Sequence, residues 1–131
     1  MDNRIEVTHY DHIVTEIPNG FDGYKFTNFR LPCRQRTWLI EEIEHESPDI
    51  IVSTGDLVHD TGSYTPGLRL CKHLIDIAPV YAVTGNHDLW RSDYDEFERE
   101  LTEVGVKTLH DERVILKRNE SEISLSGIDD P

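Results

Sequence analysis

Two short runs of the sequence end in nearly the same way: Asp49-Ile50-Ile51-Val52-Ser53-Thr54-Gly55-Asp56 and Val80-Tyr81-Ala82-Val83-Thr84-Gly85-Asn86. Each run is apolar, contains several β-branched residues and is bounded by glycine, which is typical of a buried parallel strand. The two endings lie thirty residues apart, the length of one β-α-β unit. A right-handed crossover would make the strands parallel and bring both endings to one edge of a sheet. The centre of the chain is therefore predicted to be α/β.

Three segments around these strands show helical spacing. They are residues 35–46, a segment from Thr65 to the residue before Pro79, and residues 93–104. Thr65 is expected to cap its helix, with Pro66 at the first helical position. The side chains expected to face the core are Trp38, Leu39, Ile40 and Ile43, then Leu70, Cys71, Leu74, Ile75 and Ala78, and then Tyr94, Phe97, Leu101 and Val104.

Shorter strands are expected toward both ends of the chain. Residues 4–16 alternate between apolar and polar side chains, residues 18–20 form a predicted turn, and a strand is expected to begin within residues 23–26. In the tail, strands are expected at residues 106–109, 114–116 and 123–125. Residues 1–131 are interpreted as one partial α/β domain with antiparallel strands at both ends.

The composition is that of an ordinary globular protein. Hydrophobic residues make up 37% and charged residues 30% of the 131 residues. No apolar run approaches the ~20 residues that a membrane-spanning helix needs, and Met1 is not followed by the apolar core of a signal peptide. The chain as given is therefore expected to be cytoplasmic, with Cys33 and Cys71 as ordinary reduced thiols.

The net charge of −13 limits the possible partners. A field of that sign repels nucleic acid and anionic membranes, so nucleic-acid binding is not expected. It also repels phosphate esters unless bound metal cations reverse the potential locally. The acidity therefore argues against a protein that binds nucleic acid without help from a metal. It neither favours nor excludes a metal-dependent phosphatase.

Asp56 and Asn86 are the candidate metal ligands. Both follow a predicted strand, and side chains that leave the ends of neighbouring parallel strands converge, since the strands lie ~4.8 Å apart. A carboxylate oxygen and an amide oxygen suit Mg²⁺, Mn²⁺ or iron. Gly55 and Gly85 allow the sharp turns that keep the ligands clear. The simpler reading is that Asp56 only caps a loop and that Asn86 begins a turn.

His87 and Asp88 follow the second candidate ligand directly. A histidine near a metal-bound phosphate can donate a proton to the leaving alkoxide, and Asp88 is expected to hold the imidazole of His87 in the required tautomer. His59 and Asp60 are left open between ligands and solvated loop residues. The histidines interpreted as surface or packing residues are His9, His12, His45, His73 and His110.

Residues 48–58 and 80–88 resemble the second and third signature blocks of the calcineurin-like metallophosphoesterases. Residues 17–26 resemble the entry to that domain in a bacterial subgroup, many of whose members are membrane-anchored, and residues 127–131 resemble a stretch midway through it. The resemblance implies an α/β/β/α sandwich, of which this chain holds the N-terminal half, with two divalent metal ions (Mn, Fe, Mg or Zn) and hydrolysis of phosphate mono- or diesters. It also implies that Asp56 bridges the metals, that Asn86 binds one, and that His87 protonates the leaving group.

The sequence departs from the family pattern at two places. The family begins its site with an Asp-x-His pair after the first core strand, where this chain has Thr27-Asn28-Phe29-Arg30-Leu31. The later histidines of the family are also missing, since no histidine follows His110. A short deletion after Phe26 and a truncation after Pro131 would explain both gaps. This chain by itself is therefore expected to be impaired or inactive.

Besides a working phosphoesterase domain, the sequence leaves two other functions open. The first is that of a degenerate relative that binds one metal weakly or serves as an interaction module. The second is that of a phosphoacceptor domain modified at Asp56, but this reading leaves Asn86 and His87 unexplained.

The tail strands at residues 106–128 are expected to lack cover over the apolar side chains of residues 114–125, so self-association through residues 106–128 is predicted.

Overall fold

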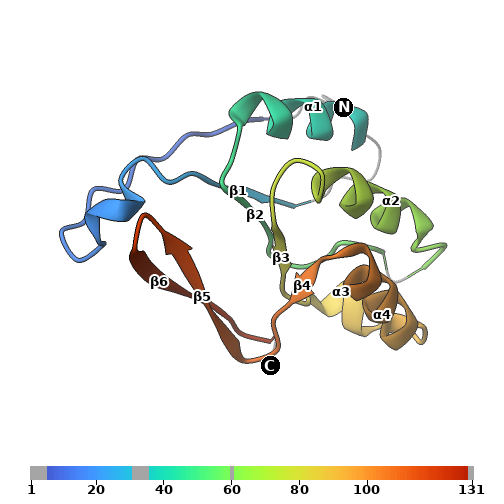
Figure 1. Cartoon of the computed structure of the whole chain (residues 1–131). Coiled ribbons are helices and arrows are strands. Elements are labelled where there is room, and N and C mark those ends of the chain that lie inside the picture. Colours follow the sequence, from blue (N-terminus) through green and yellow to red (C-terminus); the bar gives the residue numbers. More distant parts are fainter. Residues whose placement is uncertain (1–5, 31–35, 60, 130–131) are drawn as a thin grey trace.

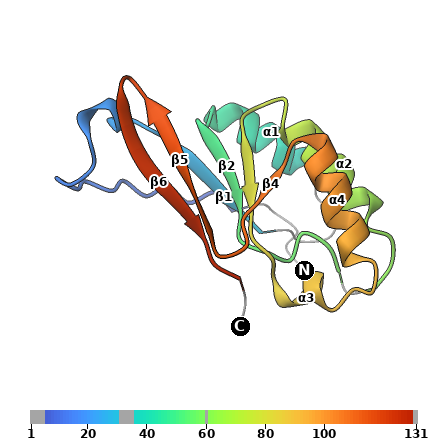
Figure 2. The same ribbon diagram turned by 60° about the horizontal axis from the view of Figure 1, so that its bottom comes forward.

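The computed structural model describes residues 6–30, 36–59 and 61–129, and these form three layers. A parallel sheet lies in the middle, helices cover one of its faces, and a β-hairpin covers the other (Figure 1). Figure 2 shows the hairpin and the helices on opposite sides of the same sheet. The arrangement agrees with the α/β/β/α sandwich that the resemblance implies. The described part of the chain supplies one helical layer and two β layers of it.

The central sheet has four parallel strands in the order β1-β2-β3-β4. The strands are β1 (Phe26–Phe29), β2 (Ile50–Ser53), β3 (Val80–Ala82) and β4 (Lys107–Thr108). Strands β2 and β3 are direct neighbours, with Ile51 opposite Val80 and Ser53 opposite Ala82. The prediction that the two quoted runs form parallel strands of one sheet is therefore confirmed; they are also direct neighbours, and both of their endings leave the sheet at one edge.

The helices of the first layer bury one continuous apolar core against this sheet. They are α1 (Arg36–Glu46), α2 (Thr65–Leu74) and α4 (Tyr94–Val104), while the short α3 (Asn86–Leu89) follows β3. Leu70, Leu74 and Phe97 are almost completely buried, and Ile51 meets them from the sheet. Burying each such side chain stabilises the fold by about 1.5–3 kcal/mol, so this layer holds β2 and β3 in place.

The hairpin of β5 (Glu112–Arg118) and β6 (Ser121–Gly127) packs on the opposite face of the sheet. Its inward side chains form a second cluster with residues of β2, β3 and the 3₁₀ helix η1 (Asn19–Phe21). The members are Phe21, Tyr24, Ile50, Val52, Tyr81, Val114, Leu116, Ile123 and Leu125. The expectation that the inward apolar side chains of residues 114–125 lack cover is thus wrong, because the parallel sheet covers them.

The structure corrects several local predictions. Residues 6–14 form neither helix nor strand, and Ile13 is 96% exposed, because alternation alone cannot make a strand without a neighbour to pair with. Trp38 lies on the exposed side of α1 rather than facing the core. Thr65 is the first residue of α2 and not its cap, a position held by Tyr64. That helix ends at Leu74, earlier than predicted, and turns lead on to Pro79.

The helices in the described part of the chain are too short and too polar to cross a membrane. The longest of them, α1 and α4, have 11 residues each, whereas a helix that spans the hydrocarbon core needs about 20.

Candidate functional site

Two loops meet at the edge of the sheet where β2 and β3 end. Gly55 has a left-handed φ of 100°, and a Cβ at this position would lie 2.8 Å from the Cα of Gly85. A Cβ on Gly85 would in turn lie 2.6 Å from the backbone nitrogen of Asp56 and would clash with its carboxylate. The glycines are therefore required because the two loop backbones touch, with no room for a side chain between them.

Asp88 joins these loops through its carboxylate. Its Oδ2 accepts hydrogen bonds from the backbone N–H groups of Asp56 and Gly85, both at 2.9 Å, and its Oδ1 accepts one from Val58 at 3.2 Å. The side chain is buried, and burial raises the pKa of the Asp88 carboxyl while the three donors oppose that rise. Asp88, expected to orient His87, thus directs its carboxylate to the backbone of both loops.

Asp56 lies where the two loops touch. Its φ of 55° is uncommon for a residue other than glycine, although aspartate tolerates it better than most. The Asp56 Oδ1 accepts a hydrogen bond of 3.3 Å from the backbone N–H of His87, and the Oδ2 accepts one of 2.7 Å from the Arg30 guanidinium. The carboxylate is therefore held between the loop after β3 and the end of β1.

Asn86 and His87 open α3 directly after Gly85. Both residues are half-buried, and the His87 ring makes an edge contact with the Trp90 ring at a centroid distance of 5.1 Å. Because the backbone N–H of His87 bonds to Asp56, the structure brings the predicted ligands and the predicted proton donor to one place at the sheet edge. Asp60 lies outside the described residues, and His59 is exposed in the loop that follows β2.

Arg91 anchors the loop that leads away from Asp56, and the sequence reasoning missed it. Its guanidinium is buried and binds Asp93 through two hydrogen bonds of 2.8 and 2.9 Å. It also donates to the backbone carbonyls of His59 at 2.6 Å and Gly62 at 2.8 Å. Arg91 lies only three residues after Asp88 in sequence, but only the folded loop reveals these acceptors.

Comparisons of the sequence with known proteins indicate a family. Residues 33–125 match the family model described as calcineurin-like phosphoesterase. A metallophosphoesterase of Bacillus subtilis (strain 168), the uncharacterized protein YkoQ, is 32% identical over 99 residues, which cover 69% of this chain and 37% of that protein.

The chain belongs to the calcineurin-like phosphoesterase family. The resemblance read from residues 48–58 and 80–88 is thereby confirmed. The chain spans little more than a third of the length of YkoQ. Membership of the family therefore does not by itself assign to this chain the activity of a full-length member.

Calcineurin-like phosphoesterases use divalent metal ions, and the described residues do not fit a two-metal centre. Among residues 6–30, 36–59 and 61–129, no group of three or more His, Cys, Asp or Glu side chains is placed to hold a metal. Asp56 offers one carboxylate, which is paired with Arg30, and Asn86 offers one amide oxygen. Mg²⁺ and Mn²⁺ prefer about six oxygen ligands, so these donors are too few even for one closed site. Burial raises the pKa of the Cys71 thiol to about 12, and this side chain lies in the apolar core under the helices, while Cys33 lies outside the described residues.

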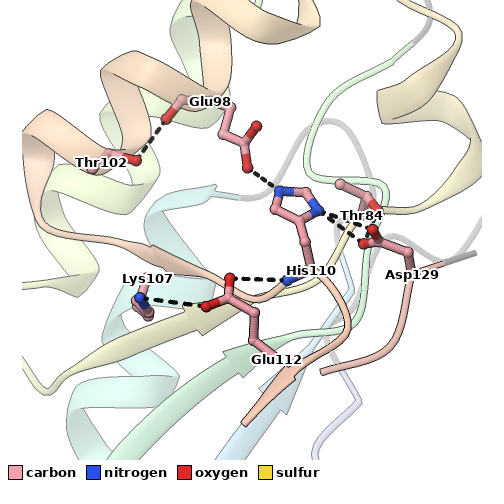
Figure 3. A network of polar contacts seen from close by, with 7 residues as sticks. All are labelled: Thr84, Glu98, Thr102, Lys107, His110, Glu112 and Asp129. Carbon is pink, nitrogen blue, oxygen red and sulfur yellow. Dashed lines mark hydrogen bonds and ion pairs between the residues drawn. The ribbon is translucent and has the colours of Figure 1, made fainter. Parts of the chain in front are cut away.

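A polar network lies beside the site and contains His110, which the sequence placed among surface or packing residues. Figure 3 shows the imidazole of His110 between Glu98 of α4 and Asp129, which follows β6. The Nδ1 atom lies 2.9 Å from Asp129 Oδ1, and the hydroxyl of Thr84 donates to that same oxygen at 3.2 Å. The network thus ties the end of β3, just ahead of Gly85, to the helix layer and to the hairpin.

Proposed function

We propose that this chain carries part of the metal site of a phosphoesterase and on its own hydrolyses phosphate mono- or diesters only weakly. The carrying observation is the carboxylate of Asp56, which lies at the contact of the two signature loops and bonds to the backbone N–H of His87. Family membership supports phosphate esters as the substrate class. The shortage of donors among the described residues supports the weak activity.

Each of the four residues has a distinct proposed role. Asp56 and Asn86 supply oxygen ligands for a divalent cation, and His87 donates a proton to the leaving oxygen of the ester. Asp88 holds the two loops at the spacing that this arrangement needs, because it accepts hydrogen bonds from both of them. The identity of the cation is left to experiment among Mn²⁺, Mg²⁺, Fe and Zn²⁺, all of which bind oxygen donors.

A second candidate function is that of a non-catalytic relative, which binds one metal weakly or serves as an interaction module. The ion pair between Arg30 and Asp56 favours it, because a 2.7 Å bond to a guanidinium occupies an oxygen that a metal ligand should leave open. The two candidates differ in one measurable property, namely metal-dependent turnover.

Turnover is tested with p-nitrophenyl phosphate and bis-p-nitrophenyl phosphate in the presence of Mn²⁺. A complete site uses two ions to activate water and to stabilise the leaving oxygen. Losing several kcal/mol of that stabilisation slows the reaction by orders of magnitude. We expect hydrolysis by this chain to stay close to the rate with Mn²⁺ alone. Rapid Mn²⁺-dependent hydrolysis that disappears in His87→Ala and persists in His73→Ala would instead show a complete site.

Metal binding is tested by calorimetry with Mn²⁺. We expect weak binding of one ion by the wild-type chain, because water must fill most of the coordination shell. The Asp56→Ala variant should lose this binding, whereas Asp76→Ala, which removes an exposed carboxylate in the turn after α2, should keep it. Two tight sites would contradict the incomplete site, and equal titrations of wild type and Asp56→Ala would remove Asp56 from it.

A further inference from the structure

Arg30 places a positive charge against the candidate metal ligand. It directly follows β1, the strand that pairs with β2, and Phe29 lies opposite Ser53 in the register of these two strands. From this position the Nη2 atom of Arg30 donates a hydrogen bond of 2.7 Å to Asp56 Oδ2. The side chain of Asp56 is only 16% exposed, whereas that of Arg30 is 72% exposed. The guanidinium therefore reaches a largely enclosed carboxylate from the solvent side.

Both carboxylate oxygens of Asp56 are engaged in this arrangement. The Oδ1 accepts the backbone N–H of His87 at 3.3 Å and the Oδ2 accepts the guanidinium of Arg30. A divalent cation that approaches Oδ2 competes with the guanidinium for this oxygen, and it is repelled by the positive charge held close by at the end of β1. Asp88 adds a second buried carboxylate close to Asp56, so Arg30 offsets part of a concentrated negative charge.

We infer that Arg30 takes the place of a cation at Asp56 and competes with divalent metal ions for this carboxylate. The inference rests on the proposed role of Asp56 as a metal ligand. It gives the Asp56 carboxylate a counter-charge from within the chain, at a place where the described residues offer too few donors to hold a metal. Because the Arg30 side chain is mostly exposed, the pair can open without unfolding the sheet.

The experiment compares Mn²⁺ titrations of the wild-type chain, Arg30→Gln and Arg69→Gln by calorimetry. Arg69 is an exposed residue of α2, so its variant makes the same change in net charge away from Asp56. Losing a partly exposed ion pair should tighten Mn²⁺ binding by Arg30→Gln roughly three- to tenfold. Arg69→Gln should bind as the wild type does, and circular dichroism checks that all three chains are folded. Equal affinity of Arg30→Gln and wild type, or no binding by either, would overturn the inference.

A double variant separates this inference from the proposed function. In Arg30→Gln, Mn²⁺ should broaden the backbone amide resonances of Gly55 and His87, which flank the carboxylate. Adding Asp56→Ala should abolish both the broadening and the gain in affinity. If the gain survives Asp56→Ala, the competition is not for Asp56 and the inference fails. The proposed function fails by a different result, namely Mn²⁺ binding by the chain with Arg30 intact that does not depend on Asp56.

Discussion

At the scale of single residues, the folded chain gives Asp88 a task in addition to the one that its place in sequence suggests. The sequence interpretation made it a partner of the His87 imidazole. In the structure its two oxygens accept three backbone N–H groups, one of which belongs to Asp56 and one to Gly85. A buried carboxylate that is bonded to two loops keeps them together, since each donor would otherwise be left without its acceptor.

Replacing Asp88 by asparagine should therefore destabilise the fold. One carboxylate oxygen becomes an NH₂ group, which faces a backbone N–H and cannot accept from it. We expect the free energy of unfolding to fall by about 1–3 kcal/mol, the usual cost of leaving a buried donor unsatisfied. Urea denaturation followed by circular dichroism measures the change. Asp76→Asn, the same substitution at an exposed position, is the control, and equal stability of both variants would contradict the role of Asp88 as a loop clamp.

At the scale of elements, His110 connects three parts of the fold that are distant in sequence. It lies between β4 and β5 and contacts Glu98 of α4 and Asp129 beyond β6, and Thr84 joins the same group from the end of β3 (Figure 3). The hydrogen bond to Glu98 raises the pKa of His110 above its ordinary value of 6.5, with a further rise from Asp129, while burial opposes them. The protonated imidazole is the form that both carboxylates stabilise.

The stability of the fold should consequently depend on pH through His110. Because its pKa is raised in the folded chain, its contribution is fully present below pH 6.5 and is lost as pH rises through the folded value. Thermal melts of wild type and His110→Gln should differ most at low pH and converge above neutrality. His73→Gln on α2 removes an exposed histidine as the control. A stability difference for His110→Gln that is constant from pH 5 to 9 would exclude this titration.

At the scale of the whole molecule, the hairpin completes one apolar interface and leaves its strand edges open. Its inner face packs on β2 and β3, as the cluster around Leu116 shows. Within the described part of the chain, however, β5 and β6 pair only with each other. An open edge presents N–H and C=O groups that can pair with a second chain, and Ile115 adds an apolar side chain that is 50% exposed.

Self-association through residues 106–128 therefore remains our prediction, now on the basis of these edges and not of an uncovered core face. Light scattering should show a mass that rises with protein concentration. Ile115→Lys should reduce the rise, because a charge on a hairpin discourages pairing. Trp38→Lys, which removes an exposed aromatic side chain of α1, should leave it unchanged. A stable monomer at high concentration, with amides of β5 and β6 strongly protected from hydrogen exchange, would contradict the prediction.

Much of the fold was predictable because its signals are local. The runs that became β2 and β3 are apolar and bounded by glycine, and the spacing of Phe97 and Leu101 marks α4 without reference to any other element. Trp38 shows where such signals stop, since helical periodicity cannot say which of two apolar sides meets the sheet. Residues 6–14 show the same limit for strands, because a strand exists only when a neighbour offers backbone partners.

The sequence by itself determined the family and the residues at the ends of β2 and β3, because residue identity and short spacing carry both. Only the tertiary structure decided what those residues contact. The pairing of Asp56 with Arg30, the bonds from the backbone of Asp56 and Val58 to Asp88, and the network around His110 join positions between 12 and 45 residues apart. Such contacts depend on the stacking of separate elements against one sheet, and no local pattern encodes that distance.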